Sequence, residues 1–234
     1  MVDRGLAESR EKARGMIMAG LVEVDGIPID KPGHPTPTSL PIRIREAPLT
    51  YVSRGGLKLE AALKAFPMVI HNKTLIDVGA STGGFTDCLL QHGAARVIAL
   101  DVGYGQFHYK LRQDPRVRVL ERTNARYLRP EDLEEEVDGA VIDVSFISLK
   151  LVIPPVSACL KPEAFMIALI KPQFEVGKGL VGKGGVVREP TLHRQVIEEI
   201  SRFSEGAGWS VIGHIPSPLL GPKGNREFLI ALRR

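Results

Sequence analysis

Two charged residues, Asp143 and Lys171, each follow an apolar run that is typical of a buried strand. Burial at a strand end disfavours either charge alone, whereas proximity of the two groups favours both charges. A lysine in such a place accepts a proton only where its surroundings favour the neutral amine, and Lys58 would supply a second cation for that purpose. The alternative is a plain ion pair that holds two loops together. A glycine-rich turn elsewhere in the chain favours catalysis over that alternative.

The glycine-rich turn covers residues 79–84 and lies between two apolar runs. The first run carries Asp77 near its end, and the second ends at Asp101. This pattern predicts one βαβ unit whose turn lets a nucleotide-like ligand approach the backbone. An acid at the end of the second strand is placed to bind ribose hydroxyls, which indicates an adenosine-bearing cofactor.

The spacing within the turn separates the cofactor classes. The glycines at 79, 83 and 84 fit neither a dinucleotide fingerprint nor a phosphate-binding loop. Asp77 would repel a pyrophosphate and suits a positively charged ligand, and S-adenosylmethionine carries a sulfonium and an ammonium but no phosphate. The alternative is an ordinary tight turn with glycines. The residues expected at this cofactor are Asp77, Gly79, Ala80, Ser81, Thr82, Gly83, Gly84, Phe85, Asp101, Val102, Asn124 and Asp143.

The residues after Asp143 limit the kinds of methyl acceptor that fit this sequence. Methylation of an exocyclic base nitrogen usually follows an acidic or amide residue, two prolines and an aromatic residue, whereas this chain has Val144-Ser145-Phe146 after Asp143. Methylation of a pyrimidine C5 needs a thiolate at a strand end, and both cysteines fall in helical-looking segments. A hydroxyl acceptor activated by a lysine fits best. No metal site is expected, because the histidines and cysteines lack ligand spacing.

Strands and helices alternate along most of the chain, which predicts an α/β fold with a parallel sheet and helices on both faces. We expect a methyltransferase domain over residues 57–234, in which a helix from Leu57 carries Lys58 near its start. The expected strands are 74–78, 96–101, 116–121, 139–144, 165–170, 210–215 and 227–232, and the expected helices are 85–92, 130–136, 149–160 and 189–205.

The first 47 residues predict a separate small domain. A helix capped by Ser9 and closed by Gly20 precedes a hairpin around Asp25-Gly26, and a proline-rich connection leads to a further short strand over 42–44. Residues 48–56 are expected to form a linker.

Composition excludes several classes of protein. The 234 residues carry a net charge of +4, and no apolar run approaches the length of about 18 residues that a membrane span needs. The N-terminus lacks the apolar core of a signal peptide, so we expect a cytoplasmic protein that does not bind membranes. Residues 110–129 hold seven Lys or Arg against two acids. That block fits either a phosphate backbone or a solvated face.

Five motifs together resemble the TlyA family, whose members are described both as haemolysins and as ribosomal RNA 2′-O-methyltransferases. These motifs are Ser53–Leu59, Asp77–Asp87, Asp143–Ser148, Lys171–Glu175 and Gly224–Phe228. The resemblance implies a Rossmann-like catalytic domain similar to the FtsJ-type ribose methyltransferases. It also implies a catalytic tetrad of Lys58, Asp143, Lys171 and Glu227, with S-adenosylmethionine as methyl donor and cytidine in ribosomal RNA or ribosomal subunits as substrate.

The resemblance also implies an RNA-binding module like that of ribosomal protein S-four at the N-terminus. Family members usually begin a half-dozen residues earlier, so this sequence starts inside the first helix of that module. The residues expected to contact RNA are Arg4, Ser9, Arg10, Lys12, Arg14, Arg54, Lys178 and Lys183. No obligate protein partner is implied.

Three questions stay open at the level of sequence. The loop over 177–185 has five glycines and two lysines, and it is either a mobile lid or an ordinary connection. An RNA-binding protein of the same fold without activity is an alternative to the enzyme, although the complete tetrad argues against it. A membrane-active haemolysin is the other alternative, and no segment of the sequence favours it.

Overall fold

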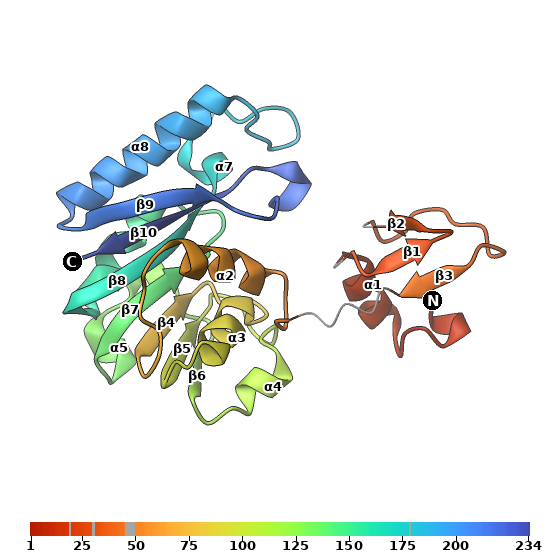
Figure 1. Ribbon diagram of the computed structural model, residues 1–234, viewed down its shortest axis with the longest axis horizontal. Coiled ribbons are helices and arrows are strands. Elements are labelled where there is room, and N and C mark those ends of the chain that lie inside the picture. The colour runs from red at the N-terminus through yellow and green to blue at the C-terminus, as the bar shows by residue number, and fades with distance from the viewer. Residues whose placement is uncertain (19, 30, 45–49, 178) are drawn as a thin grey trace. The chain divides into compact units, whose positions relative to one another are not determined.

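The computed structural model describes all of residues 1–234 except 19, 30, 45–49 and 178. The chain divides into two compact units, Met1–Arg54 and Gly55–Arg234. Each unit is built around a sheet of its own (Figure 1). The two units are described separately below.

The smaller unit contains the helix and the strands that the sequence predicts. Its elements are the 3₁₀ turn η1 (Val2–Arg4), helix α1 (Arg10–Met18) and strands β1 (Val22–Val24), β2 (Ile27–Ile29) and β3 (Ile42–Ile44). The Ser9 hydroxyl caps α1 by accepting a hydrogen bond from the Lys12 backbone N–H at 3.1 Å. Asp25 and Gly26 both have positive φ, as a tight hairpin turn between β1 and β2 requires.

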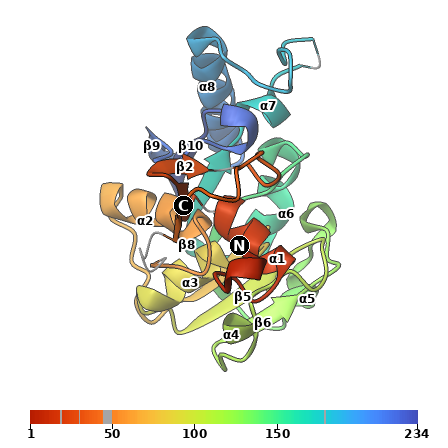
Figure 2. The ribbon, with the colours of Figure 1, turned by 90° about the vertical axis from the view of Figure 1, so that its right-hand side faces the viewer.

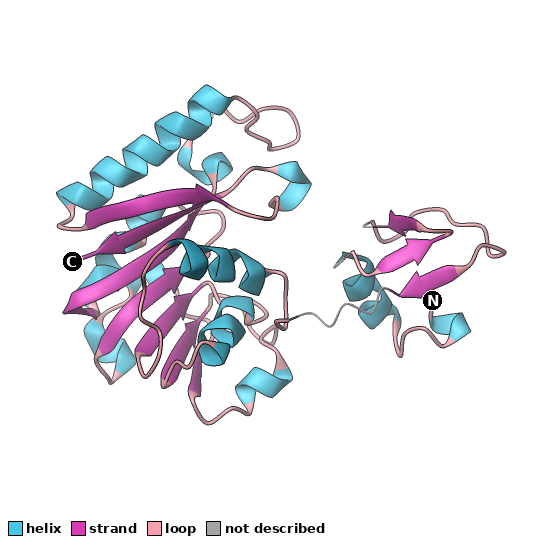
Figure 3. Ribbon diagram, in the orientation of Figure 1, coloured by secondary structure: helices cyan, strands magenta, loops and turns pink. Residues whose placement is uncertain are grey.

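The larger unit is built on one seven-stranded sheet, which Figure 3 shows as a twisted layer. Its strands are β4 (Thr74–Val78), β5 (Arg96–Leu100), β6 (Val117–Leu120), β7 (Val137–Ile142), β8 (Leu160–Ile170), β9 (Ser210–Pro216) and β10 (Phe228–Arg233). They lie in the order β6-β5-β4-β7-β8-β10-β9. The predicted parallel arrangement is correct for every strand except β10, which pairs antiparallel with both of its neighbours.

Helices cover both faces of this sheet, as the predicted α/β fold requires. They are α2 (Gly55–Ala65), α3 (Gly84–Gln91), α4 (Tyr109–Arg112), α5 (Pro130–Leu133), α6 (Ile153–Ala158), α7 (Pro172–Glu175) and α8 (Pro190–Gly206), with 3₁₀ turns η2 (Ala125–Tyr127), η3 (Leu149–Leu151) and η4 (Pro222–Gly224). Figure 2 shows α2 and α3 on one side of the sheet and α5 and α6 on the other. The buried core on the α6 side also includes residues of α8.

Several predicted boundaries are wrong, each for a local reason. The helix predicted over 149–160 is η3 followed by α6, and β8 already begins at Leu160, five residues before the predicted strand. The helix predicted over 130–136 stops at Leu133, because Glu134 takes a left-handed conformation that ends it. Helices α4 and α7 were not predicted, since four residues are too few to show a helical period.

The strand order of the sheet reverses at β4, because β5 pairs with it on one side and β7 pairs with it on the other. The Asp143 backbone N–H donates a hydrogen bond to the Val78 carbonyl at 2.9 Å, so the carboxyl ends of strands β4 and β7 lie side by side. In open α/β sheets, ligands bind in the crevice beyond the carboxyl ends of the strands at such a switch point. The glycine turn and Asp143 therefore border the same crevice.

Candidate active site

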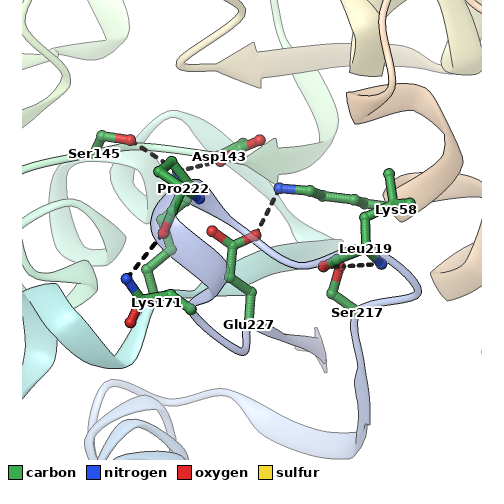
Figure 4. Close-up of polar contacts among 9 residues, drawn as sticks. Lys58, Asp143, Ser145, Lys171, Ser217, Leu219, Pro222 and Glu227 are labelled. Carbon is green, nitrogen blue, oxygen red and sulfur yellow. Dashed lines mark hydrogen bonds and ion pairs between the residues drawn. The ribbon is translucent and has the colours of Figure 1, made fainter. Parts of the chain in front are cut away.

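Four charged side chains from different parts of the chain converge at this edge of the sheet (Figure 4). Lys58 lies in the first turns of α2, Asp143 follows β7, Lys171 follows β8 and Glu227 precedes β10. The Nζ of Lys58 is 2.6 Å from Oε2 of Glu227. The Nζ of Lys171 is 2.5 Å from Oδ1 of Asp143. The four residues of the predicted tetrad thus form two ion pairs at one place.

The antiparallel direction of β10 brings Glu227 to this edge. Phe228 pairs with Ile170, so the residue before β10 lies beside Lys171, the residue after β8. Glu227 is 2% exposed and Lys171 is 8% exposed, so both charges are largely removed from water. Oε1 of Glu227 lies so close to Gly221 that a Cβ there would overlap it, so a larger residue at that position would require the Glu227 side chain to move.

The pairing differs in one respect from the arrangement that the sequence suggested. Lys58 was expected to act as a second cation on Lys171. In the structure the Lys58 charge is compensated by Glu227, whose side chain is fully buried. The immediate surroundings of the Lys171 amine are set by two oxygen atoms, those of Asp143 and Ser145, and not by the other lysine.

Ser145 is a member of the site that the sequence reasoning missed. The Lys171 amine donates a hydrogen bond to the Ser145 hydroxyl at 2.9 Å. A signal was present, because residues two apart in an extended chain point to the same side, and Ser145 stands two residues after Asp143. The sequence from Asp143 to Ser145 therefore supplies two partners for the Lys171 amine.

A cavity of about 380 Å³ opens between the glycine turn and the end of β7. Six of the predicted cofactor residues lie on its wall, namely Gly79, Ser81, Asp101, Val102, Asn124 and Asp143. The described residues of this wall include two acids and no lysine or arginine. Such a wall suits a positively charged ligand without phosphates, as the sequence predicted, and the cavity fits the cofactor in that respect.

Gly79 and the predicted cofactor residues Ala80, Thr82, Gly83, Gly84 and Phe85, which are not on the wall, shape the turn itself. Gly79 has φ of +86°, and a Cβ on it would lie 2.5 Å from the Asp143 carbonyl oxygen, so the chain passes here without a side chain. Gly83 also has positive φ. Ala80, Thr82, Gly84 and Phe85 complete the turn and the start of α3, and Ala80, Gly84 and Phe85 are buried.

Asp101 is held in place by three donors. Its carboxylate accepts hydrogen bonds from the backbone N–H groups of Ser81 and Gly103, each at 2.7 Å, and from the Gln106 side-chain amide at 2.9 Å. Asn124 accepts from the Arg126 backbone N–H through Oδ1, which leaves its amide hydrogens for a ligand. Gln106 also lies on the cavity wall and was not predicted from the sequence.

Asp77 is fully buried and is not on the wall. Its Oδ2 accepts a hydrogen bond from the Thr86 hydroxyl at 2.7 Å, and its Oδ1 has no hydrogen-bond partner. Burial raises the pKa of Asp77 to about 7, and the nearby charge of Asp143 adds to that effect. A cation bound in the neighbouring crevice would favour the ionised form of Asp77.

Comparison with known proteins decides the family. Residues 51–234 match the family of FtsJ-like methyltransferases, and residues 1–36 match the S4 domain. TlyA of Mycobacterium tuberculosis, a 16S/23S rRNA (cytidine-2′-O)-methyltransferase, is 47% identical over 100% of this chain and 87% of its own. YqxC of Bacillus subtilis, a candidate rRNA methyltransferase, is 51% identical over 99% of this chain and 83% of its own. This chain belongs to the TlyA family of FtsJ-like methyltransferases.

A solved structure agrees with that family over both units. A candidate hemolysin from Streptococcus thermophilus has 46% sequence identity and a TM-score of 0.81, with 99% of this chain and 85% of that chain covered. For a member of the TlyA family, S-adenosylmethionine is the methyl donor. Within the part of the chain that the structure describes, no helix is long and apolar enough to cross a membrane.

The residues predicted to contact RNA differ in their surroundings. In the smaller unit, the Arg4 guanidinium donates hydrogen bonds to the carbonyl oxygens of Thr38 and Leu40, and Lys12 pairs with Glu8 at 2.8 Å. Among the described residues, the exposed side chains without an ion-pair partner include those of Arg10, Arg14, Arg54 and Lys183. Lys178 lies outside the described residues, and Ser9 serves as the helix cap described above.

Proposed function

We propose that this protein transfers a methyl group from S-adenosylmethionine to a ribose 2′-hydroxyl of cytidine in ribosomal RNA. One observation carries the proposal. The largely buried amine of Lys171 is held by Asp143 and Ser145, and both of these residues line the cavity beside the glycine turn. The name of the TlyA relative from Mycobacterium tuberculosis supports the acceptor.

The residues of the site divide the chemical work. S-adenosylmethionine supplies a methyl group on a positively charged sulfur when it is bound. Lys171 accepts the proton of the ribose hydroxyl, and Asp143 holds the lysine amine in position. Glu227 orients Lys58 at the same edge of the sheet. Because the reaction joins two bound groups, correct placement of the acceptor oxygen supplies much of the rate.

A second cavity, of about 460 Å³, supports an approach of RNA from one side of the site. It shares Asn124, Ser145 and Phe146 with the cofactor cavity, and its wall also includes Arg126 and Phe174. Phe146 is 90% exposed, and its ring centroid lies 5.1 Å from that of Phe174. An exposed aromatic ring beside a half-buried one and next to an arginine suits an unstacked base of single-stranded RNA.

The basic block over 110–129 contributes less than its charge suggests. Four of its seven basic residues are paired with acids, through Arg112–Glu121, Arg116–Asp114, Arg118–Glu134 and Arg129–Asp132. Within the described chain, the members without a carboxylate at ion-pair distance are Lys110, Arg122 and Arg126. Arg126 reaches the second cavity, so we assign RNA contact to these three residues and a structural role to the paired arginines.

The test is transfer of a tritiated methyl group to isolated ribosomal subunits, followed by mapping of the modified nucleotide. A 2′-O-methyl group is recognised because it protects the neighbouring phosphodiester from alkaline hydrolysis. Lys171→Ala should lower the transfer rate at least about 100-fold, because the proton acceptor is lost. It should leave the affinity for S-adenosylmethionine, measured by calorimetry, within a few-fold of wild type.

Lys64→Ala is the matched control, since Lys64 is an exposed lysine on α2 that pairs with Glu60 away from the site. It should keep wild-type activity. Methyl incorporation into a base, or near-normal turnover by Lys171→Ala, would disprove the mechanism. An absence of both methyl transfer and S-adenosylmethionine binding would favour the RNA-binding protein without activity.

A further inference from the structure

The hydroxyl of Ser145 stands where the proposed reaction needs a fixed direction for the Lys171 amine. The Oγ of Ser145 accepts a hydrogen bond from Nζ of Lys171 at 2.9 Å, and Oδ1 of Asp143 lies 2.5 Å from the same nitrogen. Figure 4 shows Ser145 and Asp143 close to the end of the lysine side chain. Ser145 lines both the cofactor cavity and the second cavity. The serine that accepts from the amine therefore borders both cavities.

The tetrahedral geometry of the amine makes this arrangement informative. In its ion pair with Asp143 the lysine carries three hydrogens on nitrogen, and it accepts a proton only after it has released one to solvent. The neutral amine then has two hydrogens and one lone pair besides its bond to carbon. When one hydrogen bonds to Ser145, the negative carboxylate of Asp143 beside the nitrogen repels the lone pair, and a single direction remains for it. With only Asp143 as a partner, the amine would rotate about its terminal bond and the direction of the lone pair would not be fixed.

We propose that Ser145 is a positioning residue for methyl transfer, and that it directs the lone pair of Lys171 toward the acceptor hydroxyl. This proposal rests on the proposed function, since it needs Lys171 as the proton acceptor. In the step, the ribose O–H bond breaks and an N–H bond forms on Lys171, while the ribose oxygen forms a bond to the methyl carbon. The bond between that carbon and sulfur breaks, and its electron pair stays on sulfur.

The fold explains why a hydroxyl suits this place better than a second acid. The loop from Asp143 to Ser148 is fixed at its far end, where the Ser148 hydroxyl and the Leu149 backbone N–H donate to the Glu175 carboxylate at 2.6 and 2.8 Å. Glu175 lies on α7, which directly follows Lys171. This link holds the serine against the lysine. A neutral acceptor adds direction without adding another charge to a buried pair.

Three variants test the proposal in the full-length protein: Ser145→Ala, Ser145→Thr and Ser210→Ala. Ser210 is an exposed serine at the start of β9, and it pairs with Arg233 at the end of β10 remote from Glu227, so its replacement is the matched control. We measure kcat and KM for ribosomal subunits at saturating S-adenosylmethionine, and the affinity for S-adenosylmethionine by calorimetry.

We expect Ser145→Ala to lower kcat about tenfold, which corresponds to about 1.4 kcal/mol. The KM and the cofactor affinity should stay within about twofold of wild type. Ser145→Thr keeps the hydroxyl and should restore kcat to within about threefold. A wild-type kcat in Ser145→Ala, or equal losses in the alanine and threonine variants when both are folded, would overturn the proposal. Loss of cofactor affinity instead of kcat would also overturn it.

A second readout separates this proposal from the proposed function. The rate at which a small amine-acylating reagent labels Lys171 is compared with that of Lys58, which pairs with Glu227, by mass spectrometry. The ratio should rise at least about threefold in Ser145→Ala, because the lysine loses one of its two partners. An unchanged ratio overturns the role of Ser145. If the ratio rises but the wild-type protein does not methylate ribosomal RNA, the proposed function is overturned. The result then shows only that Ser145 contacts Lys171.

Discussion

At the scale of single residues, the site depends on how far each charge is buried and what compensates it. Lys171 and Glu227 are almost completely buried, and each has an oppositely charged partner within 2.6 Å. Asp77 is the exception, because it is fully buried and, among the described residues, its hydrogen bonds come from the uncharged Thr86. A carboxyl in such surroundings keeps its proton to a higher pH than one in water.

The raised pKa of Asp77 predicts how stability depends on pH. In the unfolded chain this carboxyl ionises near pH 4, whereas in the folded protein its pKa is about 7. Between these values the folded state binds more protons, so the free energy of unfolding should fall as pH rises from about 4 to 7. The Asp77 contribution to that fall is about 1–4 kcal/mol.

The variant Asp77→Asn has no carboxyl to titrate at this position. Its free energy of unfolding should therefore lack that part of the fall between about pH 4 and 7. The measurement is urea unfolding of both proteins at several pH values in the absence of cofactor. Equal pH dependence in the wild type and the variant would contradict the prediction. S-adenosylmethionine should reduce the fall in the wild type, because a bound cation favours the ionised form of Asp77.

At the scale of elements, the ion pair of Lys58 and Glu227 links α2 to the start of β10 across 169 positions of sequence. Its partner pair links the ends of β7 and β8. The glycine turn adds the end of β4, since Gly79 passes directly over the Asp143 carbonyl. Each functional group therefore lies at the end of a rigid element or beside one, which limits its movement.

Removing one member of the α2–β10 pair should be costly. Lys58→Met leaves the fully buried side chain of Glu227 without a partner, and we expect the free energy of unfolding to fall by about 3 kcal/mol. The double variant Lys58→Met, Glu227→Gln removes both charges and should lie within about 1.5 kcal/mol of wild type.

Denaturant unfolding at neutral pH measures both values. Lys64→Met, on the exposed face of the same helix, should change stability by less than about 0.5 kcal/mol. If the single and double variants of the α2–β10 pair are equally stable, the pair does not compensate the buried charge of Glu227.

At the scale of the whole molecule, the residues proposed for catalysis all belong to one unit of the chain, whereas the residues proposed to contact RNA belong to both. All four residues of the proposed tetrad and the cavity that we propose for the cofactor belong to Gly55–Arg234. The S4 domain lies in Met1–Arg54, where Arg10 and Arg14 are exposed on α1. This division predicts that RNA affinity and turnover respond to different substitutions.

Neutralising α1 should weaken RNA binding without affecting the chemical step. For the double variant Arg10→Gln, Arg14→Gln we expect roughly tenfold weaker binding to ribosomal RNA near 0.1 M salt. The slope of log affinity against log salt concentration should become shallower by about one to two, since one to two phosphate contacts are lost. The kcat at saturating RNA should stay at the wild-type value. Arg202→Gln, an exposed change on α8, is the control in filter binding over a salt series. A reduced kcat at saturating RNA would contradict the division.

The sequence by itself determined the features that depend on neighbouring residues. Local patterns of glycines, helix caps and apolar runs predict the turn over 79–84, the capped helix after Ser9 and the charges that follow β7 and β8. The motifs also identified the family, and the resemblance named the four residues that we propose as the tetrad. Lys58 and Glu227 could be named only through that resemblance, because no local pattern relates residues 169 positions apart.

Only the tertiary structure decided which of these groups meet. In the seven-stranded sheet, β10 runs antiparallel to both of its neighbours, and this reversal places Glu227 beside Lys171 at the carboxyl edge of the sheet. The same packing pairs Lys58 with Glu227 instead of leaving it as a second cation for Lys171, and it sets Ser145 against the lysine amine. Strand direction and side-chain pairing arise from burial of both sheet faces at once, and a local stretch of sequence does not contain that information.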